Sequence, residues 1–291
     1  MNILIICLIC LILIILLKQR NNFNNYLLFE NFKDKYNIEN DNYDKQYVDI
    51  CNIIENDKKC IKNDIKNINK YLKNDIPKKI VDLGCGTGHY TNGFLEIGYE
   101  VIGVDKSRNM LEKATIENPR CDFIRGDIKN NNLFENNTLY NIFIGKNVLN
   151  LNTYSDIVEI IKNVSKWITK GGNIIVNMYD ENNMNKIFPR EYSQYFKNKN
   201  KKNDGINDVT FTHFKKFRYD TWIKNISKNK YDLFEKIVLE NGDNRIKKQE
   251  LTILPKTKLI DLFIQNNFII KNVIKNRYKY IKNNLLIFQK K

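Results

Sequence analysis

The chain reads Lys79-Ile80-Val81-Asp82-Leu83-Gly84-Cys85-Gly86-Thr87-Gly88, so that a short apolar run ends abruptly in three glycines spaced two apart. A short apolar run closed by glycine is typical of a buried parallel strand. The glycines allow a tight turn and let a ligand approach bare backbone. Residues 89–97 have the apolar spacing of a helix, so the loop would present its N–H groups at a helix N-terminus. The stretch therefore predicts a strand, a ligand-binding loop and a helix.

The alternation of strand and helix continues on both sides of this unit. Four further runs have the pattern of strands, namely Tyr99–Asp105, Cys121–Arg125, Leu139–Ile144 and Asn173–Met178. Ser107 is a suitable N-cap for a helix, and apolar spacing predicts another helix over Tyr154–Lys170 that stops at Gly171-Gly172. Residues 43–75 predict one or two helices that end before Pro77. This order predicts a parallel, doubly wound α/β sheet with its ligand at the carboxyl ends of the strands.

The alternation of predicted strands and helices stops after Tyr179. Residues 209–254 alternate loosely, and Asn241-Gly242-Asp243 is a strong hairpin turn. We therefore expect an accessory antiparallel β region inserted at about residues 180–254. Pro255 then opens a helix, and two closing strands follow at Phe268–Ile274 and Leu285–Phe288.

Composition and net charge restrict the possible functions less closely than the sequence patterns do. The chain has 291 residues, of which 42% are hydrophobic, and a net charge of +15. This charge favours acidic partners such as nucleic acid or anionic lipid, although a genome rich in lysine codons would produce it equally well. Of the six cysteines, Cys7 and Cys10 lie in the apolar N-terminal run and Cys85 lies in the glycine loop, while the other three form neither a CxxC motif nor a paired framework. Reduced thiols are therefore expected, and no metal site is expected.

The N-terminus differs from the rest of the chain. Ile3–Leu17 is apolar throughout and is followed by Lys18-Gln19-Arg20. With Met1 and Asn2 counted, the run reaches the length of about 17 residues that suffices to span a bilayer, and no small-residue cleavage site follows it. We expect residues 1–20 to be a transmembrane anchor and residues 21–42 a polar linker. The basic residues after the run predict that the remaining chain lies on the cytoplasmic side.

The glycine loop and three later motifs together resemble those of a known family. A dinucleotide fingerprint would place a third glycine at His89. Residues 81–88 instead resemble the first motif of class I S-adenosylmethionine-dependent methyltransferases. Val104-Asp105, Gly126-Asp127-Ile128 and Lys170-Gly171-Gly172 resemble later motifs of that family and occur in its order. The resemblance covers about residues 43–291 and implies a Rossmann-like, seven-stranded sheet that binds S-adenosyl-L-methionine.

The resemblance also implies roles for individual residues. Asp105 would hold the ribose hydroxyls, Asp127 and Ile128 would contact the adenine, and Asp82 would lie near the methionine moiety. Asp127 could instead be a turn residue. Strand four departs from the family, because Tyr140-Asn141 stands where an acid is frequent. The complete set of predicted cofactor-binding residues is Asp82, Gly84, Cys85, Gly86, Gly88, Asp105, Lys106, Met110, Asp127, Ile128, Lys146 and Asn147.

The methyl acceptor has no clear signature in the sequence. Methyl transfer from a sulfonium needs alignment of the reactants more than a general base, so no catalytic residue is assigned. Tyr43 and Tyr47 match a region that forms a lid in many small-molecule members, or they are core aromatics. His213 could act as a base or be structural. No Asn/Asp-Pro-Pro-Tyr/Phe motif and no Pro-Cys pair follows strand four, which argues against adenine amino and cytosine C5 methylation.

Three functions remain compatible with the sequence. The favoured one is a membrane-tethered methyltransferase that acts on a small molecule. The alternatives are an RNA (cap or tRNA) methyltransferase, which the net charge favours, and a non-catalytic S-adenosylmethionine-fold binding protein. The overall pattern also resembles methyltransferase-domain proteins of large DNA viruses, in which case the membrane would be that of the host or the virion.

Overall fold

The structure is a computed structural model that describes residues 43–72, 77–145, 148–179, 194–196, 209–278 and 281–291. The chain divides into two compact units, Met1–Ile38 and Glu39–Lys291. The first unit lies outside the described residues, and so do the predicted anchor and linker. Among the residues that the structure describes, no helix is long and apolar enough to cross a bilayer. The anchor therefore stays a prediction.

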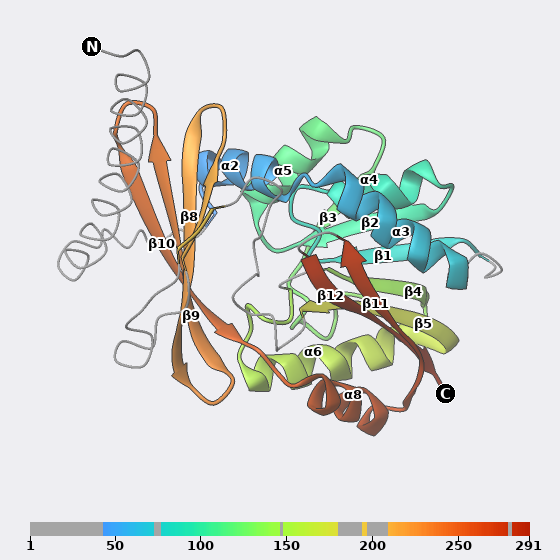
Figure 1. Cartoon of the computed structure of the whole chain (residues 1–291). Coiled ribbons are helices and arrows are strands. Elements are labelled where there is room, and N and C mark those ends of the chain that lie inside the picture. The colour runs from blue at the N-terminus through green and yellow to red at the C-terminus, as the bar shows by residue number, and fades with distance from the viewer. Residues whose placement is uncertain (1–42, 73–76, 146–147, 180–193, 197–208, 279–280) are drawn as a thin grey trace, which may run out of the picture. The chain divides into compact units, whose positions relative to one another are not determined.

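The second unit is built on a seven-stranded sheet in the order β11-β12-β5-β4-β1-β2-β3 (Figure 1). Its strands are β1 Lys79–Leu83, β2 Glu100–Asp105, β3 Asp122–Arg125, β4 Leu139–Ile144, β5 Ile168–Tyr179, β11 Phe268–Tyr278 and β12 Ile281–Lys290. Strands β1 to β5 run parallel, whereas β12 pairs antiparallel with both β5 and β11. The predicted α/β sheet and its closing antiparallel pair are confirmed.

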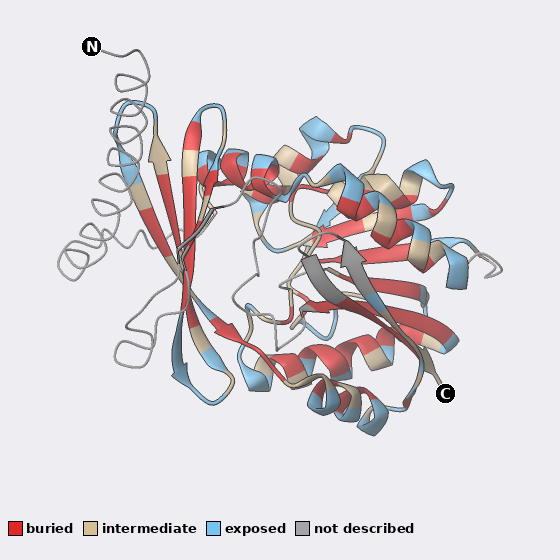
Figure 2. Cartoon of the chain, viewed as in Figure 1, coloured by how far each residue is buried: buried red, intermediate tan, exposed pale blue. Residues whose placement is uncertain are grey.

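Helices cover both faces of this sheet (Figure 1). They are α2 Lys45–Glu55, α3 Lys58–Leu72, α4 His89–Glu96, α5 Arg108–Glu117, α6 Tyr154–Trp167 and α8 Lys256–Gln265. Side chains alternate across each strand, so Ile142 and Ile144 pack in the core that includes residues of α6 and α8. Phe143 points to the other face and packs in the core that includes residues of α3 and α4. Figure 2 shows the central strands β1, β4 and β5 largely buried between these two layers.

Helix α6 ends earlier than its sequence predicts. The helix stops at Trp167, and the next residue, Ile168, already has extended backbone (φ −80°, ψ 139°). Ile168 pairs with Leu139 of β4, so tertiary pairing converts the last predicted turn of helix into strand. Gly171, at φ +79°, lies inside β5 where the register with β4 shifts. The prediction that Gly171-Gly172 stops the helix is wrong, because the glycines allow an irregularity within the strand.

A second, antiparallel sheet occupies the predicted insert. Its strands are β6 Gln194–Phe196, β7 Val209–His213, β8 Phe217–Ser227, β9 Lys230–Leu239 and β10 Asn244–Thr252, in the order β10-β9-β8-β7-β6. The predicted turn at Asn241-Gly242-Asp243 joins β9 to β10, with Gly242 at φ +91°. Phe217 and Ile237 of this sheet pack against Ile50 of α2. The insert therefore forms one core with the N-terminal helix of the described unit.

The buried Asn141 links three strands of the main sheet. Its Nδ2 donates to the carbonyl of Lys79 at 3.0 Å, and Asn173 Nδ2 donates to its Oδ1 at 3.2 Å. We predict that Asn141→Ala lowers the free energy of unfolding by about 2 kcal/mol, because it leaves buried polar groups without partners. Urea denaturation measures this loss, with the exposed Asn136→Ala as the control. Equal stability of the two variants would contradict the prediction.

Candidate active site

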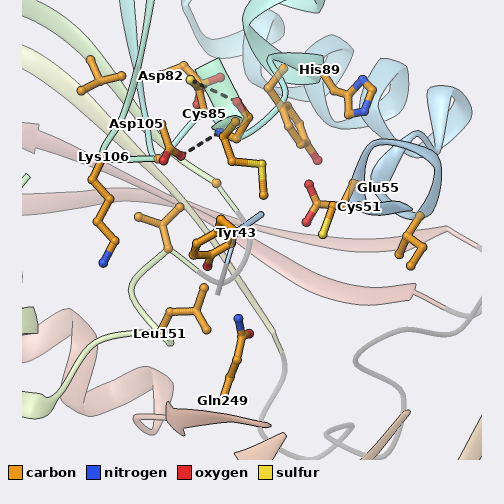
Figure 3. Close-up of a pocket in the computed structure, with 18 of the residues that line it drawn as sticks. Tyr43, Cys51, Glu55, Asp82, Cys85, His89, Asp105, Lys106, Leu151 and Gln249 are labelled. Carbon is orange, nitrogen blue, oxygen red and sulfur yellow. Dashed lines mark hydrogen bonds between the residues drawn. The ribbon is translucent and has the colours of Figure 1, made fainter. Parts of the chain in front are cut away.

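A cavity of about 570 Å³ lies where the parallel strands of the main sheet end, opposite α2 and the insert (Figure 3). Most of the predicted site residues line it: Tyr43, Tyr47, Asp82, Gly84, Cys85, Gly86, Asp105, Lys106, Met110, Asp127 and Ile128. Gly88 and His213 do not line this cavity. Lys146 and Asn147 lie outside the described residues, although their neighbours Gly145 and Val148 line the cavity.

The glycine loop turns sharply between β1 and α4. Gly84, Gly86 and Gly88 have φ values of +72°, +55° and +81°, in the region that favours glycine. A Cβ atom on Gly86 would have only Glu55 Oε2 nearby, at 3.8 Å, so this residue presents bare backbone to the cavity. A Cβ atom on Gly88 would lie 2.8 Å from the ring of Phe123. Gly88 therefore serves close packing of the loop against β3.

Asp105, at the end of β2, holds the loop in place. Its Oδ2 accepts from the N–H of Gly86 at 3.0 Å, and its Oδ1 accepts from the N–H of Ser107 at 2.9 Å. Ser107 caps α5 as predicted, because its side chain accepts from the N–H of Met110. Burial raises the pKa of Asp105. A carboxylate has about four acceptor sites, so Asp105 can still accept hydroxyl hydrogen bonds from a ligand.

The segment after β3 completes this side of the cavity. Asp127 Oδ1 accepts from the N–H of Lys129 at 2.9 Å, so this acid shapes a turn while lining the cavity. Ile128 is 9% exposed, and Asn163 of α6 donates to its carbonyl at 3.2 Å. In the part of the chain that the structure describes, no group of three or more His, Cys, Asp or Glu side chains could hold a metal ion.

Asp82 lies at the bottom of the cavity and is 1% exposed. It follows Val81 on β1 and so points toward α4, where Thr91 Oγ1 donates to its Oδ2 at 2.7 Å. Burial raises the pKa of Asp82 to about 7, although the Thr91 hydrogen bond opposes this shift. Burial, with the nearby Asp82 and Asp105, also raises the pKa of the Cys85 thiol. Cys85 is therefore a neutral thiol and a poor nucleophile.

The opposite wall comes from α2 and the insert. Glu235 of β9 is 4% exposed and accepts hydrogen bonds from the hydroxyls of Tyr47 (2.8 Å) and Tyr219. The ammonium of Lys247 lies 4.0 Å from Glu235 Oε2 and 3.5 Å from the centroid of the Tyr47 ring. Tyr47 is thus both a buried core aromatic and a cavity residue. The buried carboxylate joins α2 to the insert.

The two histidines take different places. His213 is exposed at the end of β7 and lies opposite Arg218 of β8. The structure does not bring it to the cavity. His89 lines the cavity, but its Nε2 lies 3.2 Å from the carbonyl of Asn52. Figure 3 shows its ring directed toward the helix that carries Glu55. Burial lowers the pKa of His89, which favours the neutral ring at pH 7.

Sequence reasoning missed several residues of the second wall. The sequence does mark Glu235 as unusual, because it stands between Leu233 and Ile237 on the buried face of a strand, where an acid is rare. Nothing in the local sequence marks Glu55 as a cavity residue, since only the tertiary packing of α2 brings its carboxylate near Gly86. Tyr219 reads as an ordinary strand aromatic until β8 is placed beside the cavity.

Comparison with known proteins agrees with this geometry. A family model described as "Methyltransferase domain" matches residues 74–242. The putative methyltransferase YqeM of Bacillus subtilis is 27% identical over 120 residues, which are 39% of this chain and 48% of that protein. An uncharacterised protein of Haemophilus influenzae is 46% identical over 50 residues, or 17% and 20% of the two chains. The chain thus spans about half or less of the length of these relatives.

Solved structures share the fold at low sequence identity. An S-adenosylmethionine-dependent methyltransferase from Clostridium acetobutylicum has a TM-score of 0.64 and 15% identity, over 84% of this chain and 98% of that one. The sugar N-methyltransferase KedS8 from Streptoalloteichus has a TM-score of 0.61 and 10% identity, over 88% and 97%. The amino pentose methyltransferase CalS10 from Micromonospora echinaspora, with bound S-adenosylmethionine, has a TM-score of 0.59 and 13% identity, over 87% and 100%.

These matches confirm the methyltransferase resemblance, while the likeness to viral proteins stays a prediction. The family match covers more than half of the chain, and the fold agrees along nearly the whole length of the solved structures. This chain belongs to the methyltransferase domain family.

Proposed function

We propose that this protein transfers a methyl group from S-adenosyl-L-methionine to a small molecule held between the main sheet and the insert. The observation that carries the proposal is the cavity itself. It extends from the glycine loop and Asp105 to Tyr219 and Glu235 of the insert. Donor and acceptor would therefore share one enclosed space, which in-line methyl transfer requires.

The chemistry of the lining residues fits the methyl donor. Asp105 has acceptor capacity left for the two ribose hydroxyls. Ile128 and Leu151 supply apolar surface for the adenine, and Asp127 lies beside them. The bare backbone of Gly86 leaves room for the methionine moiety, and Asp82 supplies a negative charge for its ammonium group.

The bound donor supplies an activated methyl group on a sulfonium. The residues of the chain bind and orient the two reactants and exclude water. Tyr47 and Tyr219 are held by Glu235, so the wall that faces the glycine loop is rigid. Rigid placement converts a reaction between two molecules into an effectively intramolecular one, which can lower the barrier by several kcal/mol. No side chain is required as a general base.

The lining favours a small molecule over RNA. Two acids of the second wall, Glu55 and Glu250, line the cavity and would repel a phosphodiester backbone. Two proteins with this fold are named as methyltransferases of sugars, KedS8 and CalS10. RNA methylation would instead require binding that weakens steeply with salt. A non-catalytic role would show donor binding with no methyl transfer to any acceptor pool.

Asp105→Ala tests the donor site. We predict that it weakens S-adenosylmethionine binding roughly 10- to 100-fold, because it removes charge-assisted hydrogen bonds to the ribose. Calorimetry measures the affinity, and incubation of the wild type with labelled donor and separated metabolite, RNA, lipid and protein pools identifies the acceptor class. The exposed Asp122→Ala is the matched control. Undiminished binding by folded Asp105→Ala would refute this role, and label found only in RNA would refute the small-molecule acceptor.

The pH dependence of donor binding tests Asp82. Only the ionised carboxylate attracts the donor's ammonium, and burial raises the pKa of Asp82 to about 7. We therefore predict that affinity for S-adenosylhomocysteine, which keeps this ammonium, increases as pH rises from 6 to about 8 and then levels off. The slope approaches about tenfold per pH unit below the pKa. Calorimetry at several pH values measures it.

Asp82→Asn is the control for this pH profile. Its side-chain oxygen can still accept from Thr91, but it cannot ionise. We expect the variant to bind weakly, with an affinity that stays flat between pH 6 and 8. A wild-type affinity that is flat over the same range would contradict the role of Asp82.

We also propose that residues 3–17 tether the protein to a membrane, with the methyltransferase domain on the cytoplasmic side. The apolar run and the basic residues after it support this proposal. In the full chain, Ile9→Arg with Ile12→Arg should release the protein from membranes during alkaline carbonate extraction. Two arginines near the centre of a span cost about 5–7 kcal/mol of insertion free energy.

The matched control for the tether is Ile9→Leu with Ile12→Leu, which keeps the run apolar. This variant should remain with the membrane fraction, like the wild type. Release of the wild type by carbonate would exclude a transmembrane anchor.

A further inference from the structure

We infer that the basic outer face of helix α3 docks the protein onto an anionic lipid surface. This face consists of the exposed lysines Lys58, Lys59, Lys62, Lys66 and Lys70. It lies outside the cavity, whose lining includes none of these lysines. The inference rests on the proposed membrane tether in one respect, since the tether would bring this face within reach of a bilayer.

The lysines of α3 lie on the opposite side of the helix from its buried residues. From Lys58 to Lys70 every fourth residue is a lysine, which places these side chains along one stripe about 18 Å long. The buried apolar residues pack in a core with α4 and the main sheet, and they are Ile61, Ile65, Ile68 and Leu72. Figure 2 shows α3 in the outer layer, with exposed residues on its outer side. The helix therefore presents a basic stripe to solvent.

No described acid neutralises this stripe. The sole acid within α3 is Asp64, which is 0% exposed and accepts from Tyr90 Oη at 2.6 Å and from Asn177 Nδ2 at 3.0 Å. Asp57 precedes the helix, and its Oδ1 accepts from the N–H of Cys60 at 3.0 Å. Among the described residues, none of the five lysines forms an ion pair.

The strand beside α3 adds no acid either. β11 contacts α3 and forms the edge of the main sheet (Figure 1). It contains no Asp or Glu, and its Lys271 and Lys275 are exposed. Helix α5 differs, because its Arg108 pairs with Glu112 at 2.9 Å. The side of the molecule that α3 and β11 form is therefore strongly basic, and such a surface attracts anionic partners.

This arrangement is unfavourable for the helix by itself. Like charges four residues apart repel one another along a helix. Lys58 and Lys59 also lie in the first turn, where the helix dipole disfavours cations. An anionic surface would offset both effects, because it places negative charge along the whole stripe. Each lysine held near such a surface contributes about fivefold in affinity.

The position of α3 favours a lipid surface over RNA. α3 follows the short helix α2, which is about 16 Å long, and the predicted linker of residues 21–42 spans at most about 75 Å. A bilayer that holds residues 3–17 would thus lie within reach of α3. In addition, no aromatic residue stands between the lysines, whereas proteins bind single-stranded nucleic acid by stacking its bases on aromatic rings.

Docking through α3 would also orient the site. Asp57 and Ile61, at the start of α3, line the cavity. A domain that rests on its basic stripe would therefore hold the cavity close to the membrane surface.

The test measures vesicle binding by the full chain with Ile9→Arg and Ile12→Arg, in which the apolar run no longer inserts. The vesicles contain phosphatidylcholine alone or with about 30 mol% phosphatidylserine. Lys62→Gln, Lys66→Gln and Lys70→Gln are then added together as the α3 triple variant. We expect this variant to bind the anionic vesicles roughly 100-fold more weakly than its parent. The parent should bind neutral vesicles weakly and should lose its anionic preference as salt rises.

Two further triple variants in the same background are the controls. The first removes the same charge from exposed positions of the insert and consists of Lys216→Gln, Lys224→Gln and Lys228→Gln. It should weaken binding by less than about fivefold. The second keeps the charge of α3 and consists of Lys62→Arg, Lys66→Arg and Lys70→Arg. It should bind as tightly as the parent.

Urea denaturation distinguishes docking from a structural role of the lysines. Because the α3 triple variant relieves repulsion, its free energy of unfolding should equal or exceed that of the parent. A lower value together with lost vesicle binding would assign the lysines to the fold and overturn the inference. Equal vesicle binding by the α3 and insert triple variants would also overturn it. So would a loss of binding to an unstructured RNA oligonucleotide while vesicle binding stays unchanged.

These outcomes are separate from those of the proposed function. If the wild type does not bind S-adenosylhomocysteine, the proposed function fails, whereas the vesicle measurements still decide the role of α3. If carbonate releases the wild type, the transmembrane anchor fails, and the same measurements still show whether the folded domain docks on lipid.

Discussion

The carboxylate of Asp105 is the interaction on which the site depends. It accepts from the N–H of Gly86 in the glycine loop and from the N–H of Ser107 at the start of α5. The end of β2 thus holds both the loop and the next helix in place. Because the loop has left-handed backbone at three glycines, it needs such an external acceptor to keep one conformation. The floor of the cavity follows from this arrangement.

A second buried carboxylate organises the opposite wall. Glu235 accepts from Tyr47 of α2 and Tyr219 of β8, so it joins two segments far apart in sequence. Burying an acid is costly unless it is hydrogen-bonded, and here two hydroxyls and the ammonium of Lys247 surround it. Hydrogen bonds to Asp105 and Glu235 therefore hold the two sides of the cavity, in addition to apolar packing. This explains how an insert with little regular sequence pattern becomes part of the site.

The sequence predicted most of the main sheet, because its strands are short apolar runs and its glycine loop is distinctive. It also located the turn at residues 241–243, where local chemistry dominates. It failed at the end of α6, where pairing of Ile168 with Leu139 overrides helical spacing. It placed His213 as a base candidate, yet that side chain is exposed away from the cavity. Local patterns cannot report pairings that form across the fold.

The glycine-loop side of the cavity was readable from the chain alone, since the residues that line it lie at or after the ends of strands β1, β2 and β3 and carry their own motifs. Parallel strands bring such segments to one edge of a sheet whatever else the chain contains. The opposite wall of the cavity was decided by tertiary structure. Glu55, Tyr219 and Glu235 lie on elements whose local sequences are ordinary, and only the packing of α2 against the insert brings them to the cavity. Long-range packing has no local sequence signature, which is why the sequence named the methyl donor and left the acceptor open.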